Sequence, residues 1–198
     1  MLPMDMPDPA SVARHVIQLL GGREKAFQVL DADFQAARRR WAQDTAKIGR
    51  ILRAHLFVEH FLSEHLQAKN PNLGSLDEAR ITFAQKLALI DAKTSTVAYL
   101  LPGMRRLNTI RNRIAHSLHA DVTEDDAREF MAARLFTAMR EELAKTEQRV
   151  LSSDPIDIME DFAIHAGSVL HQSPMTAVWE QAFQMAQKEC KHRKGVNP

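Results

Sequence analysis

Apolar residues recur at the spacing of an α-helix along nearly the whole chain, and this periodicity constrains the fold more than any other feature. Valine and isoleucine occur mostly inside such patterns, and no alternating run of strand length stands out. Long stretches rich in Ala, Leu, Glu, Arg and Gln also favour helix over sheet. The sequence therefore predicts an all-α protein.

The first expected helices are bounded by glycine and proline. A proline-rich segment, "MLPMDMPDPA", precedes a short helix expected over residues 11–20, which should end at a Gly-Gly pair. The next helix is expected over residues 23–47, and its pattern continues without a clear stop as far as an Asn-Pro pair. Gly49 marks either a break in that pattern or a close helix crossing. The apolar side of residues 23–47 contains Phe27, Leu30 and Phe34.

Residues typical of helix N-termini predict where the later helices begin. Ser75 and Glu78 have the Ser-x-x-Glu spacing of a capping box, so a helix should begin there. Pro102 begins or bends the following helix, and Thr123, with three acids after it, predicts the N-terminus of a helix running to about residue 150. The last two helices are expected over residues 155–171 and 174–193.

These elements predict an up-and-down helical bundle with extra helices at both ends. The expected division is an N-terminal arm and helices over residues 1–47, a helical core over 48–150 and a C-terminal helical extension over 151–198. A single domain is the alternative, because 198 residues with 45% hydrophobic content can bury one core without disulfides or a structural metal.

The composition limits the cellular compartments and the kinds of partner that are expected for this chain. The one cysteine, Cys190, excludes an intramolecular disulfide framework and a multi-cysteine metal site. With no basic-then-apolar leader, it favours a reducing, cytoplasmic compartment. No apolar run has the length of a membrane span, so no membrane partner is expected. The net charge of +1 neither favours nor excludes nucleic-acid binding, so only local clusters of basic residues can indicate it.

The stretch "LNTIRNRIAHSL", residues 107–118, combines a core stripe with a cationic, ionisable surface. At 100° per residue, four apolar residues fall within about 80° of one another: Leu107, Ile110, Ile114 and Leu118. Asn112 and His116 are neighbours on the opposite face. Arg111 borders the core stripe, about 140° from His116 in a straight helix. The face with Asn112 and His116 should meet solvent or a second copy of itself.

"RNRIAH" matches the Arg-x4-His signature of the HEPN superfamily, and the chain resembles bacterial members of that group over roughly residues 48–150. Two earlier segments, "HLFVEHFLSEHL" and "FAQKLAL", precede the motif in the order found in those relatives. HEPN domains are small all-helical domains, many of which are metal-independent RNases. Active members dimerise so that two such motifs meet in one cleft.

The resemblance implies an endoribonuclease with Arg111, Asn112 and His116 as its catalytic residues and with no metal or cofactor. RNA carries its own nucleophile, so the site needs a proton carrier, for which imidazole is suited near neutral pH. Arg111 could bind the scissile phosphate and stabilise its growing charge, while Asn112 orients the imidazole or the phosphate. The products would be a 2′,3′-cyclic phosphate and a 5′-OH, and a toxin or phage-defence role with an antitoxin protein is one context.

Other cations of the same region are candidate RNA contacts. Arg105, Arg106 and Arg113 are predicted to bind RNA phosphates, with a solvated or intersubunit role for Arg113 as the alternative. For Arg111, the alternative to phosphate binding is an ion pair with a buried acid such as Glu59. Trp41 and Trp179 are expected to pack rather than to stack on bases.

Two histidine–glutamate pairs, His55/Glu59 and His60/Glu64, have the i,i+4 spacing that metal sites use. Each pair supplies only two ligands, and the two pairs point about 140° apart on one helix. Hydrogen-bonded core or intersubunit histidines are therefore predicted instead of a metal site.

Two functions of other classes remain open beside the RNase. One is a non-catalytic HEPN-like module that binds RNA, a nucleotide or a protein partner, and the other is a helical adaptor or regulator. A homodimer without a membrane partner is expected for the chain.

Overall fold

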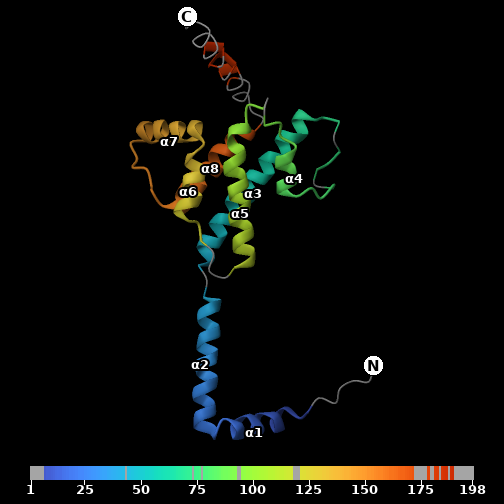
Figure 1. The fold of residues 1–198 in the computed structure, drawn as a ribbon, viewed down its shortest axis with the longest axis vertical. Helices are drawn as coiled ribbons and strands as arrows, with labels where there is room; N and C mark the ends of the chain where they lie inside the picture. The colour runs from blue at the N-terminus through green and yellow to red at the C-terminus, as the bar shows by residue number, and fades with distance from the viewer. Residues whose placement is uncertain are drawn as a thin grey trace, which may run out of the picture. The chain divides into compact units, whose positions relative to one another are not determined.

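The structure is a computed structural model that describes residues 7–42, 44–72, 74–76, 78–92, 95–117, 121–171, 178, 181–182, 184–186 and 188–189. Within these ranges there are eight α-helices, one short 3-10 helix (Ala98–Leu100) and no strand, which confirms the all-α prediction (Figure 1). The α-helices are α1 Pro9–Leu19, α2 Arg23–Trp41, α3 Thr45–Lys69, α4 Phe83–Ala88, α5 Leu101–His116, α6 Glu124–Met131, α7 Arg134–Glu147 and α8 Pro155–Leu170. Most of the helix expected over 174–193, with Trp179 and Cys190, lies outside the described residues.

The chain divides into two units, Met1–Asp44 and Thr45–Pro198. In the first unit, the Asp8 carboxylate caps α1 by accepting from two backbone N–H groups, and α1 ends before two glycines of positive φ. The predicted helix at 11–20 and its glycine stop are thus confirmed. Among the described residues of α1 and α2, only Ala26 is buried.

The expectation of one continuous helix through residues 23–47 is wrong. The chain leaves helical geometry at Ala42 and re-enters it at Thr45. Asp44 directly precedes α3, at a position where an aspartate is favoured because its carboxylate can accept from free N–H groups. Gly49 is neither a break nor a crossing, since it lies inside α3 with open space around it. Trp41, which was expected to pack rather than to stack on bases, is 86% exposed and does not pack within its own unit.

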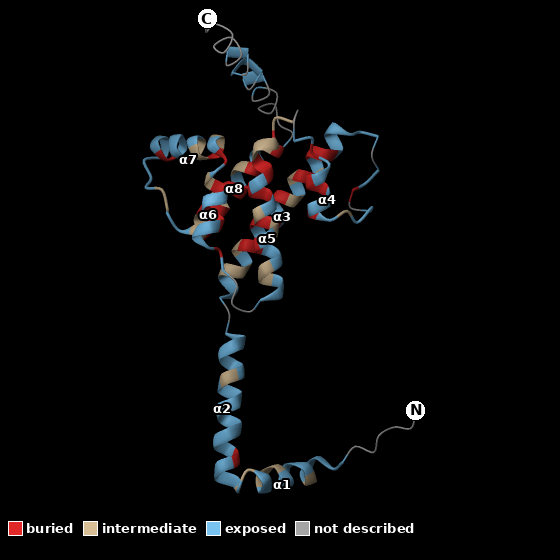
Figure 2. Cartoon of the chain, viewed as in Figure 1, coloured by how far each residue is buried: buried red, intermediate tan, exposed pale blue. Residues whose placement is uncertain are grey.

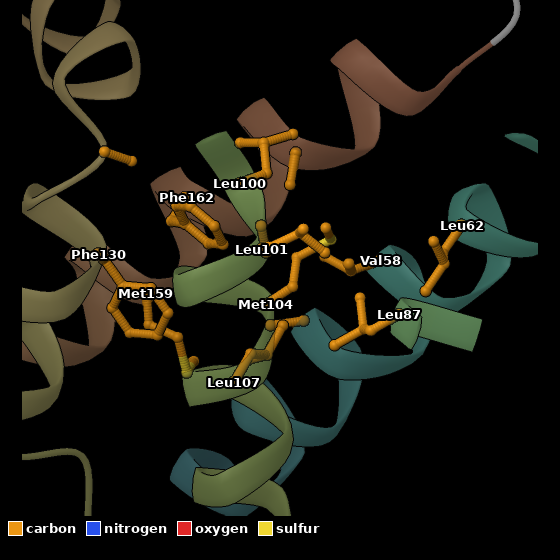
Figure 3. Close-up of a cluster of buried hydrophobic side chains, with 14 of the residues drawn as sticks. Val58, Leu62, Leu87, Leu100, Leu101, Met104, Leu107, Phe130, Met159 and Phe162 are labelled. Carbon is orange, nitrogen blue, oxygen red and sulfur yellow. The ribbon is translucent and has the colours of Figure 1, made fainter. Parts of the chain in front are cut away.

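The core of the second unit lies between α3, α5, α6 and α8, with α3 and α8 in the most extensive contact. Figure 3 shows Val58 of α3, Met104 and Leu107 of α5, and Phe162 of α8 in this cluster. Its aromatic part consists of three fully buried phenylalanines, in which the Phe162 ring centroid lies 4.9 Å from that of Phe130 and 5.4 Å from that of Phe136. This cluster fixes the buried side of α5, which carries the motif.

Two predicted helix boundaries need correction. Ser75 Oγ accepts from Glu78 N at 3.3 Å, but no helix follows, because Arg80 adopts a positive φ of 51°. The helix begins at Phe83 instead, behind a capping box of Thr82 and Gln85. The local Ser-x-x-Glu signal therefore marks a turn.

The helix predicted from Thr123 to about residue 150 begins as expected, with a capping box between Thr123 and Asp126. It is interrupted at residues 132–133, which separate α6 from α7. The break allows Phe130 and Phe136, on either side of it, to pack against the same ring of Phe162. Tertiary packing thus overrides the continuous helical pattern.

A partly buried polar pair beside this core makes the stability depend on pH. The Tyr99 hydroxyl lies 2.8 Å from Nε2 of His165, and burial lowers the pKa of His165 to about 4. Histidine in an unfolded chain titrates near 6.5, so between about 6.5 and 4 the unfolded chain binds a proton that the folded one does not. Stability should therefore fall as the pH drops through this window and level off below it.

The variant His165→Gln keeps an acceptor for Tyr99 but cannot be protonated. Urea unfolding at pH 7 and pH 4.5 should show a smaller loss of unfolding free energy in this variant than in the wild type. Acid effects of carboxylates are common to both proteins, so equal losses would contradict a neutral, partly buried His165.

Candidate functional site

The motif forms the second half of α5, an uninterrupted helix that has Pro102 in its first turn, as predicted. Its core stripe is confirmed: Leu107 and Ile110 are fully buried and Ile114 is half-buried, while Leu118 lies outside the described residues. Asn112 and His116 are exposed. The helical projection therefore describes the orientation of the motif correctly.

Arg106 and Arg113 hold α5 against the start of α6. Arg106 Nε lies 2.6 Å from Oδ1 of Asp126, whose carboxylate is fully buried. Arg113 donates to the other oxygen of Asp126 and, at 2.6 Å, to the backbone carbonyl of Asp121. Burial alone would raise the pKa of Asp126, but Arg113 and the Thr123 N–H outweigh it and hold the pKa below its ordinary value. Two of the three predicted RNA-binding arginines are therefore engaged in an ion-pair cluster within the chain.

Arg105 and Arg111 do not belong to the ion-pair cluster of Arg106, Arg113 and Asp126. Both are exposed, and neither forms an ion pair with the residues that the structure describes. Arg111 Nη1 donates to Oδ1 of Asn112 at 3.1 Å. The alternative partner considered for Arg111, Glu59, instead receives Lys86 Nζ at 3.1 Å. Arg105 and Arg111 are thus available to an external anion.

Within one chain, the structure does not place Arg111 and His116 on the same side of α5. The helix runs without interruption to His116, so the two residues remain about 140° apart around its axis. Arg105, Asn112 and His116 share the exposed side, seven and four residues apart. A site that uses both Arg111 and His116 needs a second copy or another surface.

A polar cluster joins α3, α4 and α5 beside the motif. His55 Nε2 lies 3.3 Å from Oδ1 of Asn108, and His55 Nδ1 lies 3.7 Å from Oε2 of Glu59. His55 and Lys86 are buried. Burial lowers the pKa of His55, and the charges of Arg111 and Lys86 lower it further, against the opposing effects of Asn108 and Glu59. His55 is therefore a neutral hydrogen-bonding group near Arg111.

This cluster was only partly visible in the sequence. The sequence predicts core or intersubunit histidines hydrogen-bonded to glutamates, but it does not identify Asn108 as a partner of His55. The signal for Lys86 was a lysine inside the apolar run "FAQKLAL", where it occupies a core position. The meeting of Asn108 with His55 depends on how α5 crosses α3, which spacing alone does not specify.

The second histidine pair is separate and exposed. His60 Nε2 lies 3.4 Å from Oε1 of Glu64, and His171 Nδ1 lies 3.9 Å from Oε2 of the same residue. Among the described residues, no group of three or more His, Cys, Asp or Glu side chains could hold a metal ion. The exposed groups of the motif are a guanidinium, an amide and an imidazole, which can bind an anion and carry a proton.

In the part of the chain that the structure describes, no helix is both long and apolar enough to cross a bilayer. Comparison of the chain with family models, curated proteins and solved structures found no match.

Proposed function

We propose that the protein is an HEPN-like, metal-independent endoribonuclease that acts as a homodimer. The observation that supports this most strongly is that the polar residues of α5 fall into an ion-paired group and an exposed group. Arg106 and Arg113 are engaged with Asp126, whereas Arg111, Asn112 and His116 are exposed and make no ion pair with the described residues. Exposed groups of this kind, in an Arg-x4-His pattern, are suited to phosphate binding and proton transfer.

The proposed site combines Arg111 of one copy with His116 of the other. Their separation of about 140° around α5 prevents a shared site on one straight helix, but a second α5 can supply the missing partner. A two-fold axis would generate two equivalent sites. Asn112 lies one turn before His116 and beside Arg111, so it can orient either group.

Cleavage at this site requires one proton transfer away from the nucleophile and one toward the leaving group. His116 takes the proton of the RNA 2′-OH as this oxygen bonds to phosphorus. The bond from phosphorus to the 5′-oxygen breaks, and that oxygen takes up a proton from the imidazolium or from water. Arg111 stabilises the charge on the non-bridging oxygens. The products are a 2′,3′-cyclic phosphate and a 5′-OH.

The exposed Arg105 is the proposed guide for the RNA backbone, since it shares the side of α5 that carries His116. RNA and a second copy are the proposed partners. A toxin or phage-defence role in the cytoplasm, with an antitoxin protein as a further partner, belongs to the same proposal.

Incubation of the protein with total RNA in EDTA tests the proposal. The wild type should release cyclic-phosphate ends, and His116→Ala should reduce the rate by about 100-fold or more. His15→Ala is the matched control, because His15 is another exposed helical histidine, in the unit that does not contain α5. Cleavage that survives His116→Ala, or that requires a divalent metal, would refute the assignment.

A non-catalytic HEPN-like binding module is the second candidate. The observation that favours it is the placement of Arg111 and His116 on different sides of α5 in one chain. Such a protein would bind RNA with an affinity that falls with salt, but would release no product, and Arg105→Ala would weaken this binding. A helical adaptor would show neither binding nor cleavage.

A further inference from the structure

Among its described residues, the first unit has no core of its own. Its two helices bury only Ala26 among their described residues, and both are exposed along nearly their whole length (Figure 2). The α2 helix contacts α1, but most of the stability of a helix in a protein comes from packing of its apolar face. The stability of α2 therefore depends on a surface that covers it.

The exposed side of α2 has the spacing of a coiled-coil seam. Its apolar residues follow one another by three, four, three and four positions, which is the a and d pattern of the heptad repeat: Phe27, Leu30, Phe34, Ala37 and Trp41. The four large ones are between 54% and 86% exposed. A strict a/d stripe is narrower than the face that a helix presents to a globular core, and it fits one other helix.

The charged residues beside the seam indicate which helix pairs with α2. Asp31 and Arg38 occupy the e positions, and Asp33 and Arg40 occupy the g positions. No ion pair within the described residues engages these four side chains. The acids lie in the first half of the seam and the arginines in the second half. Two copies of α2 in antiparallel orientation would therefore place the acids of each copy beside the arginines of the other.

We propose that α2 pairs antiparallel with α2 of a second copy of this chain. In this register Phe34 packs against the partner's Ala37, and Leu30 packs against the partner's Trp41, so that a large residue meets a small one at the centre. Asp31 then faces the partner's Arg38, and Asp33 faces the partner's Arg40. The two-fold axis produces each pair twice.

A parallel pair explains the sequence less well. It would place Asp33 opposite the partner's Arg38 but would leave Asp31 and Arg40 without opposite charges, and it would stack Phe34 on itself. The antiparallel pair uses all four charges. This inference uses only residues of α2 and does not rest on the proposed RNase activity.

The full-length protein and two charge variants test the pairing. Light scattering after size exclusion should give the wild type twice the 22.4 kDa mass of one chain. Asp31→Arg should weaken dimerisation by about tenfold or more, because attraction becomes repulsion at two places. The double variant Asp31→Arg with Arg38→Asp should restore it. Glu142→Arg on α7, which changes the net charge equally, is the control and should have no effect.

Several outcomes would overturn the proposal. A monomeric wild type, including a monomer that binds anionic vesicles through α2, excludes self-pairing. A dimer that Asp31→Arg leaves intact must form through another surface. Failure of the double variant to recover, with an unchanged circular dichroism spectrum, excludes the antiparallel register. In a parallel pair the Arg38→Asp change would place a new carboxylate opposite Asp33 of the other copy, so the second substitution would weaken that pair further.

Discussion

Replacement of Asp126 by alanine is expected to lower the free energy of unfolding by about 3 kcal/mol. The carboxylate is fully buried, and Arg106 and Arg113 both lie against it. Its loss would leave two partly buried guanidinium groups without a counter-charge, and it would remove the acceptor for the Thr123 N–H at 2.7 Å. Urea unfolding monitored by circular dichroism measures the change.

The neighbouring residue provides the control. Asp125 is exposed and, among the described residues, pairs only with the exposed Arg128. Asp125→Ala should therefore change stability by less than about 0.5 kcal/mol. Asp126→Asn keeps the shape and one acceptor but not the charge, and should fall between the two. If Asp126→Ala were as mild as Asp125→Ala, Arg106 and Arg113 would not be structural residues, and a role in RNA binding would regain support.

Three glycine-to-alanine substitutions are expected to have effects of different size and sign. At Gly103 an added Cβ would lie 2.3 Å from the ring of Phe162, which is fully buried and packed against two other phenylalanines. Gly103→Ala should therefore destabilise the protein by about 2 kcal/mol or more, since no neighbour can move without displacing the core. Thermal and urea unfolding of the purified variants measure these effects.

The other two glycines are matched controls. Gly167 has an equally close neighbour, 2.3 Å from Phe57, but Phe57 is 40% exposed and can rotate toward solvent, so Gly167→Ala should be milder. Gly49 has nothing within 4 Å, and Gly49→Ala should stabilise α3 by about 0.5–1 kcal/mol. Equal effects at Gly103 and Gly167 would contradict the packing around Phe162. The double variant Gly103→Ala with Phe162→Leu should recover part of the loss.

The fold class and the orientation of α5 could be predicted because both depend on local periodicity. Leu107 and Ile110 are buried, and Asn112 and His116 are exposed, as the 100° projection requires. Helix boundaries were predicted less well. The break at residues 132–133 depends on the packing of Phe130 and Phe136 around a ring that comes about 30 positions later in the chain, which no local signal reports.

The roles of the arginines could not be predicted for the same reason. Arg105, Arg106, Arg111 and Arg113 are chemically identical and lie within nine residues. Asp126, on the next helix, separates them into two that are engaged and two that are exposed. The distinction arises from the contact between α5 and α6, so it is visible only in the folded chain.

The proposed active site is shared between Arg111 of one copy and His116 of another. Its most direct test mixes two inactive variants, Arg111→Ala and His116→Ala, in equal amounts under conditions that exchange subunits. Half of the dimers would then be mixed, and one of their two sites would be intact, so activity should return to about one quarter of the wild-type rate. Restoration to that level supports the shared site; a mixture that stays as inactive as its components contradicts it.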